Sequence, residues 1–337
     1  MRVAIVYDGA AVEEPYAFDA GVEETEAVES IVDVVEEIEA ALTARGHVPF
    51  RVSLPNDPAG ILRMIADLDA DVLFNFVESL RGKAELEGPI RGVMAVRGIA
   101  VTGAGVDGLV NCLHKPRTRA LLTAVGVPVA AGCLIRTDAD DASAITHPVI
   151  VKPAAQDASH GIDRASVCAT PLASKERAMK LIERGLGPAL VEQYIDGREY
   201  NVSMIETIVD GARRLRTLPI AEIDFGGFPP GVPRILTYAA KWDTDSLEYK
   251  GSVSVEATLP AALRASLERH AVAAFRGLDL SGYGRVDFRV DAAGSPFVVD
   301  VNPNPDFSRG AGFHLAGERG GMTYEDLVEH VARTAIL

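Results

Sequence analysis

Residues 284–302 contain two adjacent strand-like segments in which polar and apolar side chains alternate, and this pattern constrains the fold more than any other. Successive side chains of a strand point to opposite faces of its sheet. Arg285, Asp287 and Arg289 therefore share one face, although the segment is otherwise apolar. The opposite face carries Val286, Phe288 and Val290. The first segment thus has one core face and one face that gathers charge.

The second segment follows a short turn, and the length of that turn decides which residues lie opposite each other. A four-residue loop at 292–295 is a common hairpin length, and it places Asp287 opposite Asp300 and Arg285 opposite Asn302. By strict alternation the charged face of this segment carries Val298, Asp300 and Asn302, and the core face carries Phe297, Val299 and Val301. The hairpin is predicted to hold two carboxylates and an amide side by side.

Two carboxylates directly opposite each other destabilise a sheet unless a cation compensates them. Asp287, Asp300 and Asn302 offer hard oxygen ligands without a neighbouring His or Cys, a set that suits Mg²⁺ better than Zn²⁺. Because Mg²⁺ commonly binds one or two carboxylates together with substrate phosphates, the pattern predicts a nucleotide site. A solvated sheet face without metal is the alternative. The alternation with Arg285 and the turn-like segment 302–306 argue against it.

The composition narrows the classes of partner. The chain has 337 residues, a net charge of −15 and no basic cluster, which argues against a nucleic-acid-binding surface. Its first residues turn polar too soon for a signal peptide, and no apolar run reaches the roughly 20 residues of a membrane helix, so a cytoplasmic protein is expected. Cys112, Cys133 and Cys168 lie far apart among apolar residues, and we interpret them as core side chains rather than disulfides, ligands or nucleophiles.

Strand-like and helix-like segments alternate along the first third of the chain. The expected strands are 3–7, 48–52, 71–76 and 99–102, and the expected helices are 24–45, 61–68 and 89–96. This order is typical of a parallel sheet wrapped by helices. In the rest of the chain the expected strands are 133–136, 147–152, 165–168, 189–208 around a turn, and 214–223. The expected helices are 174–184, 261–278 and 323–336, and the segment between 223 and 261 is expected to be irregular. We predict three domains, at 1–103, 104–190 and 191–337.

Two further motifs carry little weight when each is taken alone. Lys152 ends an apolar strand and precedes the small-residue loop 153–161, an arrangement that can set a cation and backbone N–H groups against phosphates. A lysine at a strand end is more often simply solvated. Glu192 and Glu199 flank an apolar dipeptide and a glycine turn, where carboxylates can bind an adenine amino group and ribose hydroxyls. Two surface glutamates beside a hairpin are the simpler alternative.

The order of these motifs along the chain is far more specific than any one of them. It runs from Lys115 and Lys152 through residues 192–199 and Lys241 to the hairpin at 284–302. In this order the chain resembles the ATP-grasp superfamily, and within it the D-alanine–D-alanine ligases and their amino-acid ligase relatives. The resemblance covers nearly the whole chain. It implies an α/β (α+β grasp) fold, with an N-terminal parallel α/β domain followed by a two-subdomain ATP-grasp fold.

The resemblance also implies roles for the residues of these motifs. The implied ATP contacts are Lys115, Lys152 and Lys241 at the phosphates, Glu192, Gln193, Tyr194 and Ile195 at the adenine, and Glu199 at the ribose. The implied ligands of two Mg²⁺ ions, for which Mn²⁺ can substitute, are Asp287, Asp300 and Asn302. The implied catalytic residues are Arg285, Lys241 and Ser159. Arg285 is expected to stabilise the transition state.

The sequence departs from those ligases mainly where they hold their substrates. Residues 302–310 read Asn-Pro-Asn-Pro-Asp-Phe-Ser-Arg-Gly where the ligases typically read Asn-x-Ser-Pro-Gly. Ala158 takes the place of the first of two serines in the phosphate loop, and residues 75–82 lack the His of a His-Gly-rich substrate loop. Asp300 stands where the ligases often have Glu. The ATP-binding half therefore matches the family better than the substrate-binding half.

Five residues are expected to contact the substrates. They are Glu24, Trp242, His160, Ser308 and Arg309. For Glu24, at the start of a predicted helix, simple helix capping is an equal alternative. His160 lies in a loop and can instead be solvated, and Trp242 can instead be part of ordinary packing.

We therefore expect an ATP-dependent carboxylate–amine ligase that acts on amino-acid-like substrates. In this reaction ATP converts a carboxylate into an acyl phosphate, and an amine then displaces the phosphate to form an amide or peptide bond, with release of ADP and phosphate. A genuine D-alanine–D-alanine ligase, an intramolecular amide-forming cyclase and a non-catalytic ATP-binding regulatory protein stay open as alternatives. The resemblance also implies a homodimer.

Overall fold

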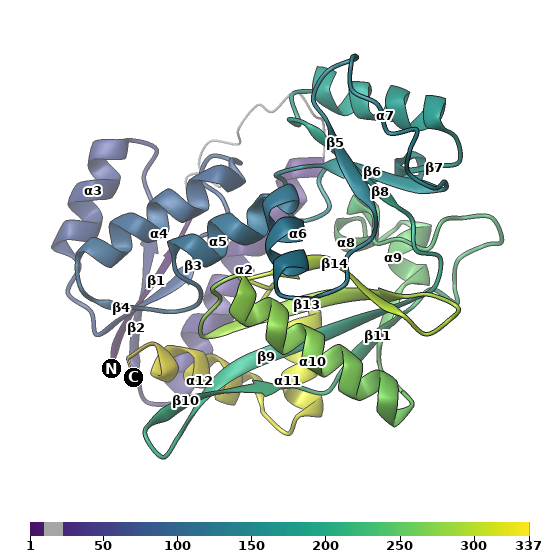
Figure 1. Ribbon diagram of the computed structural model, residues 1–337. Coiled ribbons are helices and arrows are strands. Elements are labelled where there is room, and N and C mark those ends of the chain that lie inside the picture. The colour runs from purple at the N-terminus through teal and green to yellow at the C-terminus, as the bar shows by residue number, and fades with distance from the viewer. Residues whose placement is uncertain (10–22, 337) are drawn as a thin grey trace.

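The computed structural model describes the backbone of residues 1–9 and 23–336 and the side chains of residues 1–9 and 31–336. Three β-sheets with their covering helices make up this part of the chain, and the two ends of the chain lie near each other beside the first sheet (Figure 1). Over the same residues, the model contains no helix long and apolar enough to cross a membrane.

The first sheet is parallel, as the alternation of strands and helices predicts. Its strands, in spatial order, are β2 (Val48–Ser53), β1 (Arg2–Tyr7), β3 (Val72–Phe76) and β4 (Ala100–Val101). The intervening helices are α2 (Glu23–Ala44), α3 (Pro58–Asp67), the 3₁₀ turn η1 (Ala84–Leu86) and α4 (Glu87–Val96). Strand β3 is buried along its whole length because it lies inside the sheet. Strand β3 ends with Phe76 at the carboxyl edge of this sheet. Open α/β sheets commonly bind ligands at that edge.

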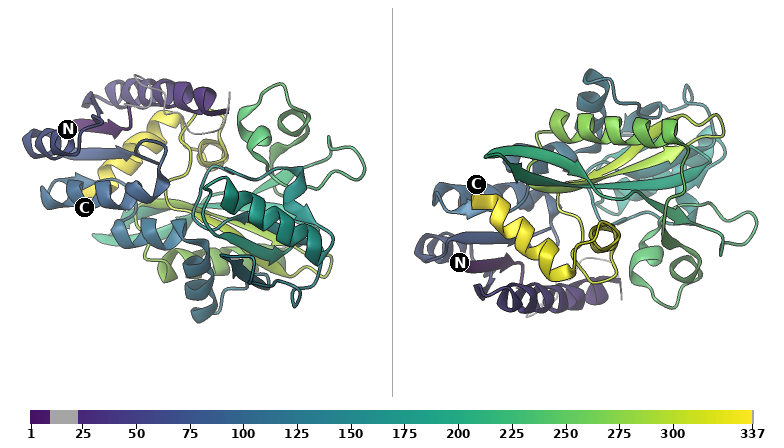
Figure 2. Two further views of the ribbon diagram at one scale, coloured as in Figure 1. Left: turned by 90° about the horizontal axis from the view of Figure 1, so that it is seen from above. Right: turned by 90° about the horizontal axis from the view of Figure 1, so that it is seen from below.

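The last helix of the chain, α12 (Tyr324–Ile336), packs mainly against α2, and it also contacts β3 and β4 of the first sheet and β9 (Arg198–Val209) of the third (Figure 2). Its buried side chains, such as Leu327 and Val331, share one core with Val35 of α2 and Phe74 of β3. The amino-terminal and carboxyl-terminal parts of the chain are therefore joined by a common hydrophobic core.

The central sheet is antiparallel and is covered by one helix. Its strands, in spatial order, are β5 (Gly132–Ile135), β8 (Ala189–Gln193), β6 (Val149–Pro153) and β7 (Val167–Cys168), and its covering helix is α7 (Pro171–Glu183). A 3₁₀ turn, η2 (Arg164–Ser166), takes up the first half of the strand expected at 165–168, and β7 forms the second half. Helices α5 (Val106–Leu113) and α6 (Lys115–Ala124) link the first sheet to this one. Since β8 crosses the expected boundary at residue 190, the bounds of the three domains stay a prediction.

The third sheet is the largest and carries the hairpin singled out by the sequence. Its strands are β9 (Arg198–Val209), β10 (Ala212–Thr217), β11 (Ala221–Asp224), β12 (Val253–Glu256), β13 (Tyr283–Val290) and β14 (Pro296–Asn302), and α10 (Ala261–Gly277) covers its apolar face. The single strand expected at 214–223 is wrong. The chain breaks between β10 and β11 at Pro219, which has no N–H to continue the ladder.

The segment between 223 and 261 is also more regular than expected. It contains the short helices α8 (Tyr238–Trp242) and α9 (Leu247–Gly251) as well as β12, and a further helix, α11 (Gly312–Arg319), follows the hairpin. Thr237 and Ser246 cap α8 and α9 by accepting hydrogen bonds from backbone N–H groups. Ser and Thr are preferred at the first position of a helix, so Thr237 and Ser246 were the sequence signal that could have predicted α8 and α9.

The predicted cross-strand pairs of the hairpin are confirmed at its functional end. Arg285 lies opposite Asn302, and Asp287 lies opposite Asp300. On β13 the predicted core residues Val286, Phe288 and Val290 are buried in the core beneath α10. The charged face of this strand is therefore the one that the alternation predicted.

The turn end of the hairpin differs from the prediction. Val290 pairs with Pro296, so the loop is one residue longer than expected, and a β-bulge that leaves Val299 unpaired restores the register. The bulge breaks the alternation, because Val298 and Val301, three positions apart, are both buried in the core. The prediction that Val299 faces the core is wrong, since a bulge turns the residues on its two sides out of simple alternation.

Candidate active site

Arg285 and Asp287 form a two-pronged ion pair at the centre of the third sheet. The Arg285 guanidinium donates from Nε and Nη2 to the two carboxylate oxygens of Asp287 at 2.8 and 2.9 Å. Asn201 on β9 donates its amide N–H to the same carboxylate at 2.8 Å. Burial alone would lower the pKa of Arg285, but Asp287 and then Asp300 raise it above its ordinary value, so the guanidinium stays charged.

The carboxylate opposite Asp287 belongs to Asp300, and cations gather around it. Lys115 Nζ, from the first turn of α6, lies 3.6 Å from Asp300 Oδ1. Although desolvation opposes ionisation, nearby cations lower the pKa of Asp300, and these are Lys115, Lys152, Lys241 and Arg285. The structure thus brings together the predicted metal ligands Asp287 and Asp300 and all four of the predicted phosphate and catalytic cations.

Lys115 also holds the phosphate loop. Its Nζ donates to the backbone carbonyl of Gln156 at 2.8 Å and lies 3.5 Å from the carboxylate of Asp157. Desolvation lowers the pKa of this lysine, but the carboxylates of Asp300 and Asp157 outweigh it and raise the pKa to about 12. The ammonium group is therefore fully charged at neutral pH, as a phosphate contact requires.

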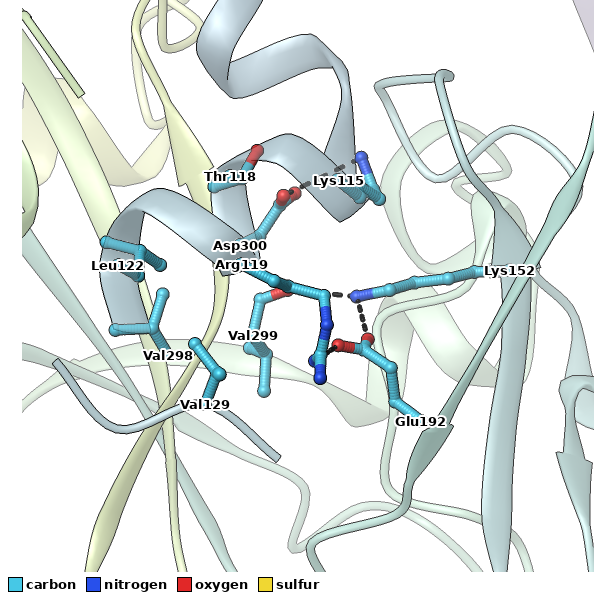
Figure 3. Close-up of a pocket in the computed structure, with 10 residues that line it drawn as sticks. All are labelled: Lys115, Thr118, Arg119, Leu122, Val129, Lys152, Glu192, Val298, Val299 and Asp300. Carbon is cyan, nitrogen blue, oxygen red and sulfur yellow. Dashed lines mark hydrogen bonds and ion pairs between the residues drawn. The ribbon is translucent and has the colours of Figure 1, made fainter. Parts of the chain in front are cut away.

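Lys152 bridges the central and the third sheet. Its Nζ lies 2.6 Å from Glu192 Oε2 on β8 and donates to the backbone carbonyl of Val299 at 2.9 Å. Val299 is the bulged residue, so the bulge turns its carbonyl toward the lysine instead of toward a neighbouring strand. These residues line a cavity of about 10 Å³, roughly the space of one water (Figure 3).

Arg119 is a site residue that the sequence prediction missed. Its guanidinium ion-pairs with Glu192 and donates to the backbone carbonyl of Ala130, and it lines the same cavity as Lys152 (Figure 3). Arg119 follows Lys115 by four positions on α6, and residues four apart lie on one face of a helix. That spacing was the signal that could have found it.

Arg289 is the second missed residue. It lies on the same face of β13 as Arg285 and pairs with Glu199, with a 3.0 Å contact from its Nη1. Its Nε donates to the carbonyl of Ile195 at 3.1 Å, and its guanidinium lies over the ring of Tyr194. The segment predicted to bind adenine and ribose is therefore clustered around one buried arginine. The alternation placed Arg289 on this face but gave it no role.

The phosphate loop is folded against α8. Ser159 Oγ donates to the carbonyl of Leu236 at 3.0 Å, and Trp242 Nε1 donates to the carbonyl of Ala158 at 3.4 Å. The ring of His160 lies 5.1 Å from that of Tyr238 on the same helix. Ala158 and Ser159 have φ angles of 53° and 62°, a left-handed conformation that costs non-glycine residues free energy and is often retained at functional sites.

Lys241, the fourth predicted cation, lies on α8 next to Trp242 and faces the hairpin. Desolvation and then the positive charge of Arg285 lower its pKa, while Asp287 and Asp300 oppose that shift. The charge of Lys241 is therefore within reach of both opposed carboxylates.

Three further residues, Ser308, Arg309 and Glu24, were predicted to contact the substrates. Ser308 donates its hydroxyl and its N–H to the carboxylate of Asp306, at 2.5 and 2.7 Å. The guanidinium of Arg309 pairs with Glu325 of α12 and lies 4.1 Å from the centre of the Tyr324 ring. Glu24 lies in the first turn of α2, and its side chain falls outside the described residues. The roles of these residues stay predictions.

The predicted metal ligands fit Mg²⁺ by their chemistry. Asp287 and Asp300 are opposed carboxylates, and Asn302 adds an amide oxygen on the same strand, which are hard ligands of the type Mg²⁺ prefers. Arg285 and Lys115 lie against the two carboxylates, so cations already compensate their charge. Across the residues described, no group of three or more His, Cys, Asp or Glu side chains is arranged to hold a metal ion. A site here therefore depends on the amide and on substrate phosphates.

Comparison with known proteins by sequence identifies the family of this chain. The family described as "D-ala D-ala ligase C-terminus" matches residues 121–333. A D-alanine–D-alanine ligase of Frankia casuarinae is 30% identical over 275 residues, which are 80% of this chain and 67% of that protein. An uncharacterised protein, y4sG, of Sinorhizobium fredii is 27% identical over 268 residues, which are 78% of this chain and 74% of that protein.

The same fold is found in a solved structure. The D-alanine–D-alanine ligase of Bacillus anthracis, in complex with ATP, superposes with a TM-score of 0.73 at 20% identity, over 100% of this chain and 97% of that one. The family match spans more than half of the chain and includes the hairpin, Lys152 and Glu192. The chain therefore belongs to the D-alanine–D-alanine ligase family of ATP-grasp ligases.

Proposed function

We propose that this protein is an ATP-dependent carboxylate–amine ligase that joins amino-acid-like substrates through an acyl phosphate and releases ADP and phosphate. The observation that carries the proposal is the convergence of Lys115, Lys152, Lys241 and Arg285 on the opposed pair Asp287 and Asp300. Phosphoryl transfer needs such a group of cations and metal ligands, because the negative charges of the phosphate oxygens and of the attacking carboxylate must be neutralised.

The first half of the reaction is phosphoryl transfer to a carboxylate. Lys115 and Lys152 hold the phosphates of ATP. Lys241 neutralises the negative charge of the phosphoryl group that is transferred. Asp287, Asp300 and Asn302 would hold Mg²⁺, which draws charge from the phosphate oxygens when it is bound. Breaking the bond between the terminal phosphorus and the ADP oxygen, and forming one to the carboxylate oxygen, gives ADP and an acyl phosphate.

The second half is attack by the amine. The amine nitrogen bonds to the acyl carbon, the carbonyl oxygen gains negative charge, and Arg285 stabilises that charge through its guanidinium N–H groups. The C–O bond to phosphate then breaks and an amide remains. The folded phosphate loop, including Ser159, and Trp242 of α8 exclude water, which would otherwise hydrolyse the acyl phosphate.

The substrates are proposed to differ from two molecules of D-alanine. Asp306 and Ala158 stand at positions where such ligases typically have Gly and Ser, and both lie in segments next to the catalytic cluster. A carboxylate in place of glycine changes the charge and the space offered to the second substrate. A related amino-acid ligase fits these residues best, with a genuine D-alanine–D-alanine ligase as the alternative within the family.

The test is release of phosphate from Mg·ATP by the purified protein, with D- and L-amino acids supplied singly and in pairs and with mass spectrometry of every positive reaction. Release that requires two amino acids, with a product of their combined mass less water, supports the ligase and names both substrates. One substrate that loses water supports a cyclase. Tight ATP binding without phosphate release, even when hydroxylamine is present to trap an acyl phosphate, overturns the proposal in favour of a regulatory protein.

A further inference from the structure

Arg289 is a buried cation on the charged face of β13 that the mechanism above does not use. It lies two residues beyond Asp287 on the strand, and it is 3% exposed. An arginine stays charged even when it is buried, so its charge and its five N–H donors must find partners inside the protein. The partners that surround Arg289 therefore indicate what it does.

The charged partner of Arg289 is Glu199 on the neighbouring strand. The two residues lie directly opposite each other in the antiparallel pairing of β13 with β9. Nη1 of Arg289 donates to Oε2 of Glu199 at 3.0 Å, and only 4% and 10% of the two side chains are exposed. Desolvation raises the pKa of Glu199, and the charge of Arg289 is the strongest influence against that shift. Arg289 thus holds the carboxylate in place and favours its charged form.

This pair belongs to a row of cross-strand pairs that leads to the catalytic cluster. Two residues closer to that cluster, Asp287 lies opposite Asn201, and Arg285 follows two residues further along. Because a strand advances about 3.3 Å per residue, Arg289 lies roughly 13 Å along β13 from Arg285. A nucleotide that places its phosphates at the catalytic end of this row can reach the other end with its sugar.

Arg289 also fixes the segment that is expected to bind adenine. Its Nε donates to the carbonyl of Ile195 at 3.1 Å, and its guanidinium lies 5.4 Å from the centre of the Tyr194 ring. The backbone N–H of Tyr194 in turn donates to the carbonyl of Pro148 at 2.9 Å. The connection between β8 and β9 is therefore held by bonds to two other parts of the chain.

A further contact of Arg289 reaches the segment that precedes α8. The Nη1 group that bonds Glu199 also donates to the carbonyl of Arg234 at 2.7 Å. Two residues later, the carbonyl of Leu236 accepts the hydroxyl of Ser159 from the phosphate loop. One guanidinium thus joins β9, the connection before it and the segment before α8. A lysine ends in a single nitrogen and cannot reach all of these acceptors with the same geometry.

The bond from Arg289 leaves Glu199 able to bind hydroxyl groups. An ionised carboxylate has about four acceptor positions on its two oxygens, and Arg289 bonds to Oε2. Hydrogen bonds to an ionised acceptor are stronger than those between neutral groups, so a charged Glu199 binds hydroxyls better than a protonated one. A buried carboxylate that lost its neighbouring cation would be protonated more readily. The strength of a ribose contact at Glu199 therefore depends on Arg289.

Resting on the ATP-dependent function proposed above, we propose that Arg289 is a positioning residue for the nucleoside half of ATP. It acts through Glu199, whose carboxylate it holds in position for the ribose hydroxyls. It has no part in the transfer of the phosphoryl group. Arg289 therefore sets how well the protein distinguishes ATP from its deoxy analogues, and it leaves the rate of the chemical step unchanged.

The test compares nucleotides that differ only in their ribose hydroxyls. ATP, 2′-deoxy-ATP and 3′-deoxy-ATP are titrated with Mg²⁺ into the full-length protein by calorimetry, so no turnover is needed. We expect the wild type to bind ATP at least about tenfold more tightly than one of the deoxy analogues, which corresponds to about 1.4 kcal/mol. Arg289→Met is expected to reduce this ratio to about twofold or less. A wild-type ratio near one overturns the inference.

The ratio separates positioning from a purely structural role. General damage to the fold weakens the binding of all three nucleotides alike, so an unchanged ratio in Arg289→Met overturns the inference. Arg289→Lys keeps the charge without the fork and is expected to give an intermediate ratio. Should Arg289→Met fail to fold, a wild-type ratio in Arg289→Lys overturns the positioning role. Arg198→Met is the matched control, because Arg198 pairs with Glu222 on the exposed side of β9, and it should keep the wild-type ratio.

A double-mutant cycle tests whether Arg289 acts through Glu199. If it does, Arg289→Met changes the ratio no further once Glu199→Gln is present. The double variant also removes both charges of the buried pair, which avoids leaving one charge buried without its partner. Additive effects of the two substitutions on the ratio overturn the assignment to Glu199.

Turnover separates this inference from the proposed function. With a carboxylate donor and hydroxylamine, Arg289→Met is expected to raise the KM for ATP about fivefold or more and to leave kcat within about twofold of the wild type, because only uniform binding is lost. Hydroxamate formation without discrimination among the three nucleotides overturns the inference and leaves the ligase intact. Discrimination that depends on Arg289, without phosphate release from any carboxylate donor, supports the inference and overturns the ligase.

Discussion

Arg285 donates two hydrogen bonds to Asp287 from a position two residues away on the same strand, so the proposed transition-state cation and a predicted metal ligand hold each other in place. This arrangement gives Arg285→Lys and Arg285→Ala the same expected outcome. Lysine keeps the charge but has no planar fork, so it cannot reproduce both bonds. We expect both variants to lose about 10²–10³-fold in kcat, as when an oxyanion donor is removed.

The measurement is phosphate release at saturating ATP, with the melting temperature as a check on folding. Arg198 forms a comparable two-pronged pair with Glu222, but on the exposed side of β9, so Arg198→Ala is the matched control. It is expected to keep full turnover. Wild-type kcat in Arg285→Ala would remove Arg285 from the catalytic step.

Lys152→Met is expected to weaken ATP binding by about tenfold or more, because a charge-assisted contact to phosphate contributes roughly 1.5–3 kcal/mol. Methionine fills similar space without charge and leaves Glu192 with Arg119 as its only ion-pair partner among the described residues. Calorimetric titration with ATP measures the change. Lys175→Met, which removes an exposed lysine paired with Asp138, is the control and should bind ATP normally. Unchanged affinity in Lys152→Met would contradict the phosphate assignment.

Glu87 gives a prediction for the pH dependence of stability. Burial first, and then the charges of Asp157 and Glu78, raise its pKa well above the ordinary value. Between its ordinary pKa and the raised pKa, the folded protein holds a proton that the unfolded chain has lost. The free energy of unfolding therefore falls as pH rises, by up to about 1.4 kcal/mol per pH unit from this group.

Glu87→Gln removes that dependence, since glutamine does not ionise. We expect the variant to gain stability relative to the wild type progressively as the pH rises above the ordinary glutamate pKa of about 4.3, as measured by urea denaturation. Glu85→Gln, at an exposed position nearby, should follow the wild-type curve. If the curves of wild type and Glu87→Gln run parallel over this range, the pKa of Glu87 is not raised in the folded protein.

Trp242 provides a direct readout of the phosphate loop. It is the only tryptophan of the chain, and its indole N–H donates to the carbonyl of Ala158 in that loop. ATP that engages the loop changes the surroundings of this indole, so we expect ATP to change the intrinsic fluorescence. Ser159→Ala removes the hydroxyl bond to Leu236 and is expected to raise the ATP concentration needed for half of the change. A fluorescence signal that is indifferent to ATP would show that the loop does not respond to the nucleotide.

The local pattern of the sequence predicted much of the site. Alternation along residues 284–290 assigned the charged and core faces of β13. The predicted pairing of Asp287 with Asp300 was right because the longer loop and the bulge at Val299 compensate each other. The parallel first sheet also followed from the order of strands and helices. These features depend on the two-residue period of a strand and on short connections, which are properties of neighbouring residues.

Only the tertiary structure decided how distant segments meet. Alternation could not place the bulge at Val299, because the bulged carbonyl is taken by Lys152 from another sheet. In the same way, Arg119 acquires its partner Glu192 only when α6 packs beside the central sheet. Phe307, after the hairpin, meets Phe74 of the first sheet only when these two parts of the chain pack together. Such pairs lie far apart along the chain, and burial of side chains in a common core, rather than any local period, brings them together.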